Sequence, residues 1–471
     1  MAGFAATVID RSLLNEACRQ APDGKVLDVA ETLAMKQGRE LTRVTLEASV
    51  NQERDEIEKR SSVNRVCQCG RSLRNRGRKA RKLLTAAGEI KLARGYFECV
   101  PCLQSGYPLD ERLGVEGRYS RNAQRLLSLA AASWSYDISS DRLAEFCGLK
   151  VSDTTIRKVA QEQGAAANEW LRTEPEAVKE FREEQGQIEF TTDGTGVNTT
   201  AGWREMKVGI FSKRDLAEPA LPEEWDSRTL PAPKVRIAFA AIEKSDDFGR
   251  RWKAWRKRLG LADTSAITVL ADGARWIWEE QAKHLRDADG VLDIFHALEH
   301  LAATGKVLHS DTATSQQWCA QAKGILLSTS YRGLEEFIQR DFATLNETQQ
   351  ASVHGLLDYL APHQHHLNYK ERLATGQSIG SGQIEGACKN LIGKRLKANA
   401  AKWRVRRVNR MAGLCSIMYT NHLGNHLGNH RKTKPPKSAT TPPHLAPQHW
   451  HRTPHSDTVT NMHIRHYATG K

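Results

Sequence analysis

Three carboxylates have the chemistry and spacing needed to bind a cation and act on a phosphate group. Asp193 ends a predicted strand in TTDGTGV, and Asp272 ends another in VLADGARW. If these strands are neighbours, both side chains emerge at the edge of the sheet where α/β folds place their ligands. Glu385, on a later predicted helix, completes the cluster if that helix packs across the sheet. Mutually repelling carboxylates need a cation; their hard oxygen atoms suit Mg²⁺, and a pair of such ions serves displacement at phosphorus.

Each carboxylate also has an ordinary structural explanation. Asp-Gly at the end of a strand is most often a turn, and Glu385 could form an exposed i,i+4 ion pair with Lys389. The constellation gains weight from residues 389–410, which contain nine cations and no acid and so suit phosphate binding. The candidate DNA-binding residues are Lys389, Lys394, Arg395, Lys397, Lys402, Arg404, Arg406, Arg407 and Arg410.

A second motif, in LDIFHALEHL, has two interpretations. His296, Glu299 and His300 form H-x-x-E-H, the pattern of an inverted-motif zinc peptidase. That site needs a third ligand, which no nearby motif supplies. Alternatively, Asp293 is an acid at the exit of a strand, and His296 follows it one helical turn later.

Four cysteines predict a small metal site. Cys67-x-Cys69 and Cys99-x-x-Cys102 flank a hairpin pattern, which is the layout of a structural zinc ribbon. No histidine precedes His284, so the ligands would be cysteines alone unless a carboxylate substitutes. Reduced, buried cysteines are the alternative. The other five are interpreted as core or surface residues: Cys18, Cys147, Cys319, Cys388 and Cys415.

Composition and charge limit the class of protein. The chain has 471 residues, 39% of them hydrophobic, which is enough for two or three cores. The absence of a long apolar run and of a signal-peptide pattern predicts a cytoplasmic protein. The net charge of +14 is regional, because residues 386–471 hold sixteen Lys or Arg and one acid, Asp457. Such a block predicts a polyanion partner, most often nucleic acid, although a solubilising tail is the alternative.

Periodicity predicts the elements that position these residues. Three consecutive strands, then further strands alternating with helices, indicate an α/β sheet. Residues 141–164 fit either a base-reading helix-turn-helix or an ordinary helical hairpin, with Gly148 at the turn and Ser152 as the N-cap. The predicted strands are 187–197, 203–212, 234–243, 266–273 and 290–295.

The segments TTDGTGV, ADGARWIW, DIFHALEHL and GSGQIEGACKNLIGKRLK together resemble the catalytic half of bacterial insertion-sequence transposases of the ISKra type, related to the Mutator-like group. The resemblance implies an RNase-H-like fold and a DDE triad of Asp193, Asp272 and Glu385. With two Mg²⁺ ions, the triad would cleave DNA at the element's ends and join it to target DNA. Asp293 and His296 match the D-x-x-H element of these relatives. The resemblance also implies a homo-oligomer assembled on DNA in the nucleoid. The lack of a long apolar run predicts no membrane association.

The sequence therefore predicts a multidomain α/β protein. A DNA-binding protein with an inactive core is the alternative function, followed by the zinc metallopeptidase. The predicted regions are an N-terminal helical region (1–60), an independent zinc-ribbon-like module (61–112), a helical region that includes the helix-turn-helix candidate (113–186), the first part of the RNase-H-like core (187–300), a helical insertion (301–375), the final core helices with the catalytic Glu and the basic surface (376–420), and a disordered basic tail rich in His and Pro (421–471).

Overall fold

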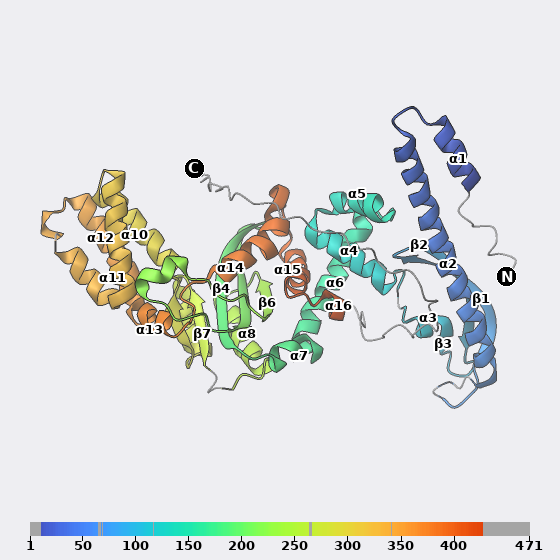
Figure 1. Cartoon of the computed structure of the whole chain (residues 1–471). Helices are drawn as coiled ribbons and strands as arrows, with labels where there is room; N and C mark the ends of the chain where they lie inside the picture. Colours follow the sequence, from blue (N-terminus) through green and yellow to red (C-terminus); the bar gives the residue numbers. More distant parts are fainter. Residues whose placement is uncertain are drawn as a thin grey trace, which may run out of the picture. The chain divides into compact units, whose positions relative to one another are not determined.

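The computed structural model describes residues 11–64, 67, 69–115, 117–262, 266–340 and 342–426. Its central element is a five-stranded mixed sheet in the order β6-β5-β4-β7-β8 (Figure 1). Neighbouring strands among β4, β5 and β6 pair antiparallel, whereas β7 and β8 extend the sheet parallel to β4. The strands are β4 (Gln187–Thr199), β5 (Gly202–Arg214), β6 (Val235–Ala241), β7 (Ile267–Ala271) and β8 (Asp289–Leu292). The predicted α/β class is confirmed.

Helices cover both faces of this sheet. Residues 206–213 of β5 are all buried, as expected for a strand covered on both sides. Phe190 of β4 packs on Trp252 of α8 (Ser245–Arg258), with ring centroids 4.9 Å apart. Since strand side chains alternate, Asp193 points to the other face, where Cys388 contacts it. That face is covered by two consecutive segments, α14 (Gly382–Ala387) and the π-helix η4 (Cys388–Lys397).

Four helices lie between the cysteine module and β4 in the chain, and two of them are joined by the turn that was predicted at Gly148. Gly148 adopts the left-handed conformation (φ 66°), and the Ser152 hydroxyl accepts a hydrogen bond from the Thr155 N–H at 3.3 Å. Gly164 lets α6 approach α15 (Val405–Tyr419) closely, because a Cβ there would lie 2.1 Å from the Arg410 carbonyl oxygen. The helical-hairpin geometry is confirmed, and base reading stays a prediction. The helices are α4 (Arg121–Ser133), α5 (Tyr136–Cys147), α6 (Asp153–Thr173) and α7 (Glu176–Glu183).

A helical insertion separates β8 from α14 and has its own hydrophobic core. Leu326 and Leu356 are buried with Val291 and Leu292 of β8, so the insertion is anchored on the edge strand. The Tyr369 hydroxyl donates to the Leu292 carbonyl at 2.8 Å. The predicted helical character of residues 301–375 is confirmed. The elements are α9 (Arg275–His284) before β8, then α10 (Ile294–Leu308), α11 (Thr312–Gln339), η2 (Phe342–Thr344), α12 (Glu347–Leu360), η3 (Ala361–His366) and α13 (Tyr369–Ala374).

The N-terminal helix and the cysteine module share one core, which corrects the prediction of an independent module. The hydrophobic cluster of the hairpin consists of Leu83, Ile90 and Leu92, too few for a separate core, and Leu46 and Val50 of α2 pack against them. The elements are α1 (Arg11–Gln20), α2 (Val26–Asn64), β1 (Arg74–Thr85), β2 (Gly88–Glu98), β3 (Ser105–Gly106) and α3 (Pro108–Leu113).

The start of the predicted tail is also corrected. Residues 423–426 form the short helix α16 (Leu423–His426), and Leu423 is buried beside His422. The remainder of the predicted tail, from residue 427, lies outside the described residues. None of the helices in the described ranges is long and apolar enough to cross a membrane.

Candidate functional site

Asp193 on β4 and Asp272, directly after the end of β7, occupy corresponding positions of two neighbouring parallel strands. The last parallel pair between β4 and β7 is Thr191 with Leu270, and each aspartate follows two residues later. Side chains two residues apart in a strand point to the same face, and adjacent strands lie about 4.8 Å apart. Asp193 does not end its strand as predicted, because β4 continues to Thr199 while pairing only with β5. The two aspartates are nevertheless brought together, as the sequence suggested.

The electrostatics of this pair favour a bound cation. Burial raises the pKa of the Asp193 carboxyl, and the charge of Asp272 raises it further. The backbone N–H of Gly194, 2.6 Å from Asp193 Oδ1, lowers the pKa only in part. A nearby like charge and low solvation both disfavour the ionised carboxylate. A cation between the two carboxylates would relieve both effects.

Glu385 shares a cavity with Asp193, but Asp272 does not line that cavity. The open cavity of about 220 Å³ is lined by Asp193, Glu385, Cys388 and Lys397, among others. Glu385 is also 3.5 Å from Lys389, so the ion pair considered as its alternative is present. Among the described residues, the three predicted acids do not form a cluster with all ligand oxygens within 4.8 Å. The tight triad expected from the sequence is therefore not formed.

The segment after Glu385 differs from the predicted α-helix, because η4 is a ten-residue π-helix. π-Helical turns are rare and occur frequently at functional sites. Leu391 and Ile392 are buried, as the apolar pattern indicated, while Lys394 and Lys397 are exposed. Lys397 Nζ donates to Thr195 Oγ1 at 2.6 Å and so holds a positive charge at the carboxylate cavity.

Seven of the nine basic residues predicted to bind DNA are exposed, and two are not. Arg395 is buried: its Nε donates to the Ala131 carbonyl at 2.5 Å, and its guanidinium lies over the rings of Tyr136 and Trp403. This arginine stabilises the core and cannot contact a phosphate, so the prediction for Arg395 is wrong. Arg410 is half-buried. The exposed cations are Lys389, Lys394, Lys397, Lys402, Arg404, Arg406 and Arg407.

The buried Asp293 and the half-buried His296 form a hydrogen-bonded pair near the aspartates. Asp293 is fully buried and caps α10; its Oδ1 accepts from the Ser381 N–H at 3.0 Å, and its Oδ2 lies 2.6 Å from His296 Nδ1. This hydrogen bond raises the pKa of His296 to about 9 against the effect of burial, and Asp272 contributes to the increase. A protonated His296 therefore lies near the two aspartates. Through its hydrogen bond with Ser381, Asp293 also links the end of β8 to the start of α14, which carries Glu385.

The peptidase arrangement is not formed. The His300 ring stacks on Tyr359 with centroids 3.7 Å apart, and His296 Nδ1 is engaged by Asp293. In the part of the chain that the structure describes, His296, Glu299 and His300 do not belong to any group of converging metal ligands.

Sequence reasoning missed the residues that hold Asp272. Trp278 Nε1 donates to the Asp272 carbonyl at 2.8 Å. Tyr359 of α12 packs on the next residue, Gly273, where a Cβ would lie 2.3 Å from the Tyr359 ring. Burial, followed by the charge of Asp272, raises the pKa of Tyr359 to about 12. Trp278 is close to Asp272 in sequence, so its contact with Asp272 could have been predicted. Tyr359 lies in the helical insertion, far from Asp272 in sequence, and nothing in the sequence indicated its contact with Gly273.

The four cysteines meet as predicted and could hold a metal ion such as zinc. Cys67 Sγ lies 3.2 Å from Cys102 Sγ, and Cys69 Sγ lies 3.5 Å from Cys99 Sγ and 3.7 Å from Cys102 Sγ. Four thiolates at Zn–S distances of about 2.3 Å in a tetrahedron are about 3.75 Å apart, so the donor set is close to that geometry. Gly70 N–H donates to the Cys67 carbonyl at 2.8 Å and closes the first ligand turn.

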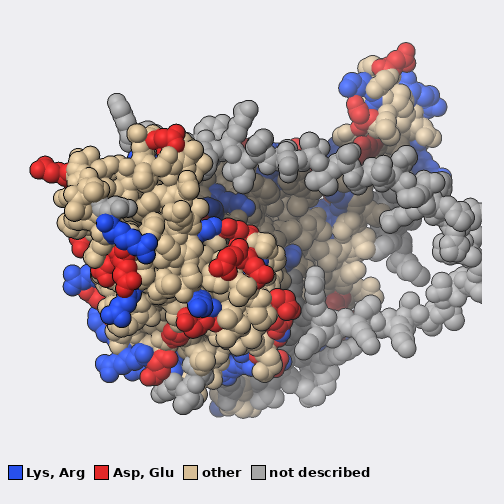
Figure 2. All heavy atoms as spheres, turned by 60° about the vertical axis from the view of Figure 1, so that its left-hand side comes forward, with Lys and Arg blue, Asp and Glu red and all other residues tan. Residues whose placement is uncertain are grey.

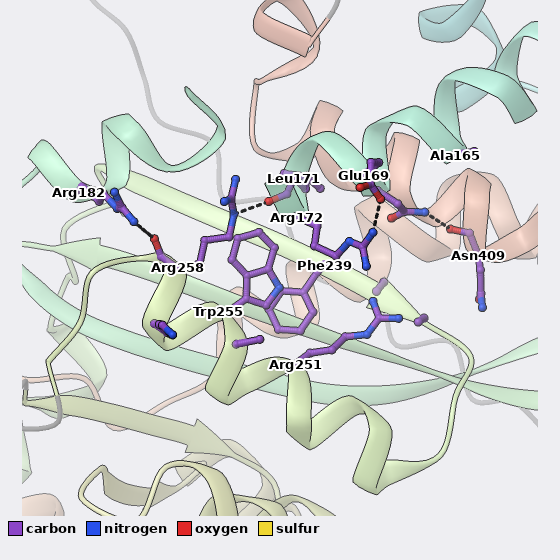
Figure 3. A pocket seen from close by; sticks show the side chains of 15 residues that line it. Ala165, Glu169, Leu171, Arg172, Arg182, Phe239, Arg251, Trp255, Arg258 and Asn409 are labelled. Atoms are coloured by element: carbon purple, nitrogen blue, oxygen red, sulfur yellow. Dashed lines mark hydrogen bonds and ion pairs between the residues drawn. The ribbon is translucent and has the colours of Figure 1, made fainter. Parts of the chain in front are cut away.

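A larger cavity, of about 800 Å³, lies between α6 and α8 and contains none of the predicted residues (Figure 3). Arginines surround its Trp255 floor, but two of them bind helix ends: Arg258 Nε donates to the Leu171 carbonyl at 2.7 Å, and Arg182 Nε to the Arg258 carbonyl at 3.0 Å. Such contacts satisfy carbonyls at helix C-termini, which is a structural role.

No protein-family model matches the chain, and no curated protein matches it significantly.

Proposed function

We propose that this chain is a DDE DNA transposase with an RNase-H-like core, of the ISKra type that its motifs resemble. The observation that carries the proposal is the placement of Asp193 and Asp272 at one level of adjacent parallel strands, with Glu385 on the cavity that Asp193 lines. The sheet order β6-β5-β4-β7-β8, with β4, β7 and β8 parallel, is compatible with the proposed core. Because one fold hosts many functions, the proposal rests on the carboxylates and not on the fold.

The side chains at the cavity suit phosphodiester chemistry. Mg²⁺ ions, when bound, would activate a water or a 3′-OH and stabilise charge at phosphorus. Asp193 and Asp272 would hold the ions, and Glu385 would join them through a side-chain movement or through bound water, which Mg²⁺ commonly retains. Lys397, fixed by Thr195, can contact a phosphate at the same cavity. The protonated His296 adds positive charge near the reacting group.

The exposed cations supply a surface for DNA. They occupy η4, the following loop and the start of α15, directly after Glu385 in the chain. By contrast, acidic and basic side chains are interspersed on the face shown in Figure 2, where the side of the helical insertion is turned forward. Lys389 and Lys397 belong to both the exposed basic residues and the lining of the carboxylate cavity, so DNA bound by these cations would pass the cavity.

Cleavage of DNA by matched variants tests the proposal. The substrate is a plasmid carrying the gene with its flanking DNA, incubated with Mg²⁺. Asp193→Asn, Asp272→Asn and Glu385→Gln should each abolish nicking while DNA binding persists, because removing a carboxylate weakens ion binding without changing the basic surface. His300→Ala and Asp141→Asn, which removes an exposed carboxylate of α5, should cut like the parent.

The alternatives give different results. A DNA-binding protein with an inactive core would bind the plasmid but show no Mg²⁺-dependent nicking in the parent. A zinc peptidase would cleave protein and depend on His300. If Glu385→Gln cuts as well as the parent while both Asp variants fail, the third acid is another residue.

A further inference from the structure

Three potential metal ligands converge between α8 and α9, on elements that the proposed chemistry does not use. Asp246 lies in the first turn of α8, and Glu280 and His284 lie four residues apart on α9. Residues four apart share one face of a helix. The ligand atoms of all three side chains lie within 4.8 Å of one another.

The buried atoms of this cluster lack hydrogen-bond partners. Glu280 is 2% exposed; Lys283 Nζ contacts its Oε1 at 2.7 Å, but its Oε2 has no hydrogen bond. His284 Nε2 is also buried without a hydrogen bond and faces Glu280 Oε2 at 3.3 Å. A buried carboxylate oxygen that makes no hydrogen bond is costly. A cation held between the two atoms would satisfy both, whereas without it their only mutual contact is the ion pair that a protonated His284 makes.

The geometry matches a shared metal ion. Two ligands bound at about 2.0–2.1 Å in a tetrahedron lie roughly 3.3–3.4 Å apart, which is the observed separation of Oε2 and Nε2. Gly249 makes the space for this arrangement: a Cβ there would lie 2.1 Å from Glu280 Oε2 and 2.8 Å from His284 Cδ2. The exposed Asp246 gives an ion access from solvent.

We propose that Asp246, Glu280 and His284 bind a Zn²⁺ ion that fastens the start of α8 to the end of α9. One imidazole and two carboxylates suit a borderline first-row metal better than Mg²⁺ or Ca²⁺, which prefer oxygen ligands alone. Water would complete the coordination. Arg250 pairs with Asp246 and Asp247, so binding requires Asp246 to exchange that partner for the ion. The site is independent of the cysteine cluster and of the proposed transposase activity.

Zinc content of the full-length protein tests this site against the cysteine site. The measurement compares the parent with Glu280→Gln and with Glu279→Gln, a matched control whose exposed side chain pairs with Arg275 on the same helix. Glu280→Gln should lose one equivalent of zinc, and Glu279→Gln none. A mercurial thiol reagent, which displaces only cysteine-bound zinc, should leave one equivalent bound in the parent and none in Glu280→Gln.

A second variant covers the case in which Glu280→Gln does not fold. Asp246→Asn changes an exposed side chain and should weaken zinc binding at the thiol-resistant site by at least about tenfold in a competition titration with a chromogenic chelator. Unchanged affinity in this variant, or equal zinc content in the parent and a folded Glu280→Gln protein, would overturn the proposal. Glu280 and His284 would then form only an ion pair.

Discussion

Replacing Asp193 with Asn should stabilise the metal-free protein at neutral pH while abolishing the proposed DNA cleavage. In the folded protein the pKa of Asp193 is raised, first by burial and then by Asp272. The fold therefore favours the protonated carboxyl over the ionised one. This contribution to stability is complete below the pKa that Asp193 has in the unfolded chain, and it is lost as the pH rises through the higher pKa of the folded protein. Near pH 7 the ionised carboxylate therefore destabilises the fold. Asn keeps the Oδ1 acceptor for the Gly194 N–H and removes the charge.

The size of the repulsion follows from the strand geometry. Two carboxylates at one level of adjacent strands are separated by about 5 Å. At an effective dielectric constant between 20 and 80, their interaction is between about 1 and 3 kcal/mol. In a domain of about 150–250 residues, each kcal/mol of added stability raises the unfolding temperature by roughly 2 to 4 °C.

Thermal unfolding in EDTA, followed by the combined fluorescence of the eleven tryptophans, measures this effect. Asp193→Asn should unfold at a higher temperature than the parent at about pH 7.5, and the difference should shrink towards about pH 4, where the parent also becomes protonated. Saturating Mg²⁺ should stabilise the parent more than the variant. The exposed Asp141→Asn is the control. If Asp193→Asn is less stable than the parent at both pH values, Asp193 is held by favourable contacts, and the argument for a repelling pair is wrong.

Three further changes test other parts of the structure. Gly273→Ala should destabilise the core by about 1–3 kcal/mol in chemical denaturation, because its Cβ would meet the Tyr359 ring, and a smaller residue at position 359 should restore stability. Cys99→Ser should remove one equivalent of zinc and lower the helicity of residues 11–115 in circular dichroism; retention of zinc would place the metal elsewhere. Lys394→Gln should weaken DNA binding and reduce its salt slope by about one, whereas Arg395→Gln should lower the unfolding temperature without a specific effect on that slope.

The strands of the sheet were predictable because period-two patterns are local signals. The Asp-Gly signal was correct for Asp272, which directly follows β7, but not for Asp193, because β4 continues through Gly194 to Thr199. The cysteine cluster was predictable from a local signal too, since each pair of ligands lies in one short turn. The boundary of its module was not, because the apolar residues of α2 that complete its core, such as Leu46 and Val50, are ordinary helix residues in sequence.

The parts that could not be predicted depend on tertiary contacts. Nothing in the spacing of the basic residues distinguishes Arg395 from Lys394, and only the folded chain shows that the aromatic rings of Tyr136 and Trp403 enclose Arg395. The cluster of Asp246, Glu280 and His284 joins two helices about thirty residues apart, and its Glu and His had no motif to mark them. Sequence also placed Glu385 in a compact triad, whereas in the structure Glu385 shares an open cavity with Asp193 and not with Asp272.

The hydrogen bonds around Asp293 have an evolutionary consequence. The helical insertion leaves the sheet at β8 and returns at residues 379–381, where Ile294 N–H donates to the Ile379 carbonyl at 3.1 Å and Ser381 N–H to Asp293 Oδ1. These hydrogen bonds therefore hold the two ends of the helical insertion next to each other. Lengthening a loop whose ends stay fixed costs little entropy, and domain insertions succeed at such places. Descendants of this gene can therefore exchange, enlarge or shorten the insertion while Glu385 keeps its position beside the sheet.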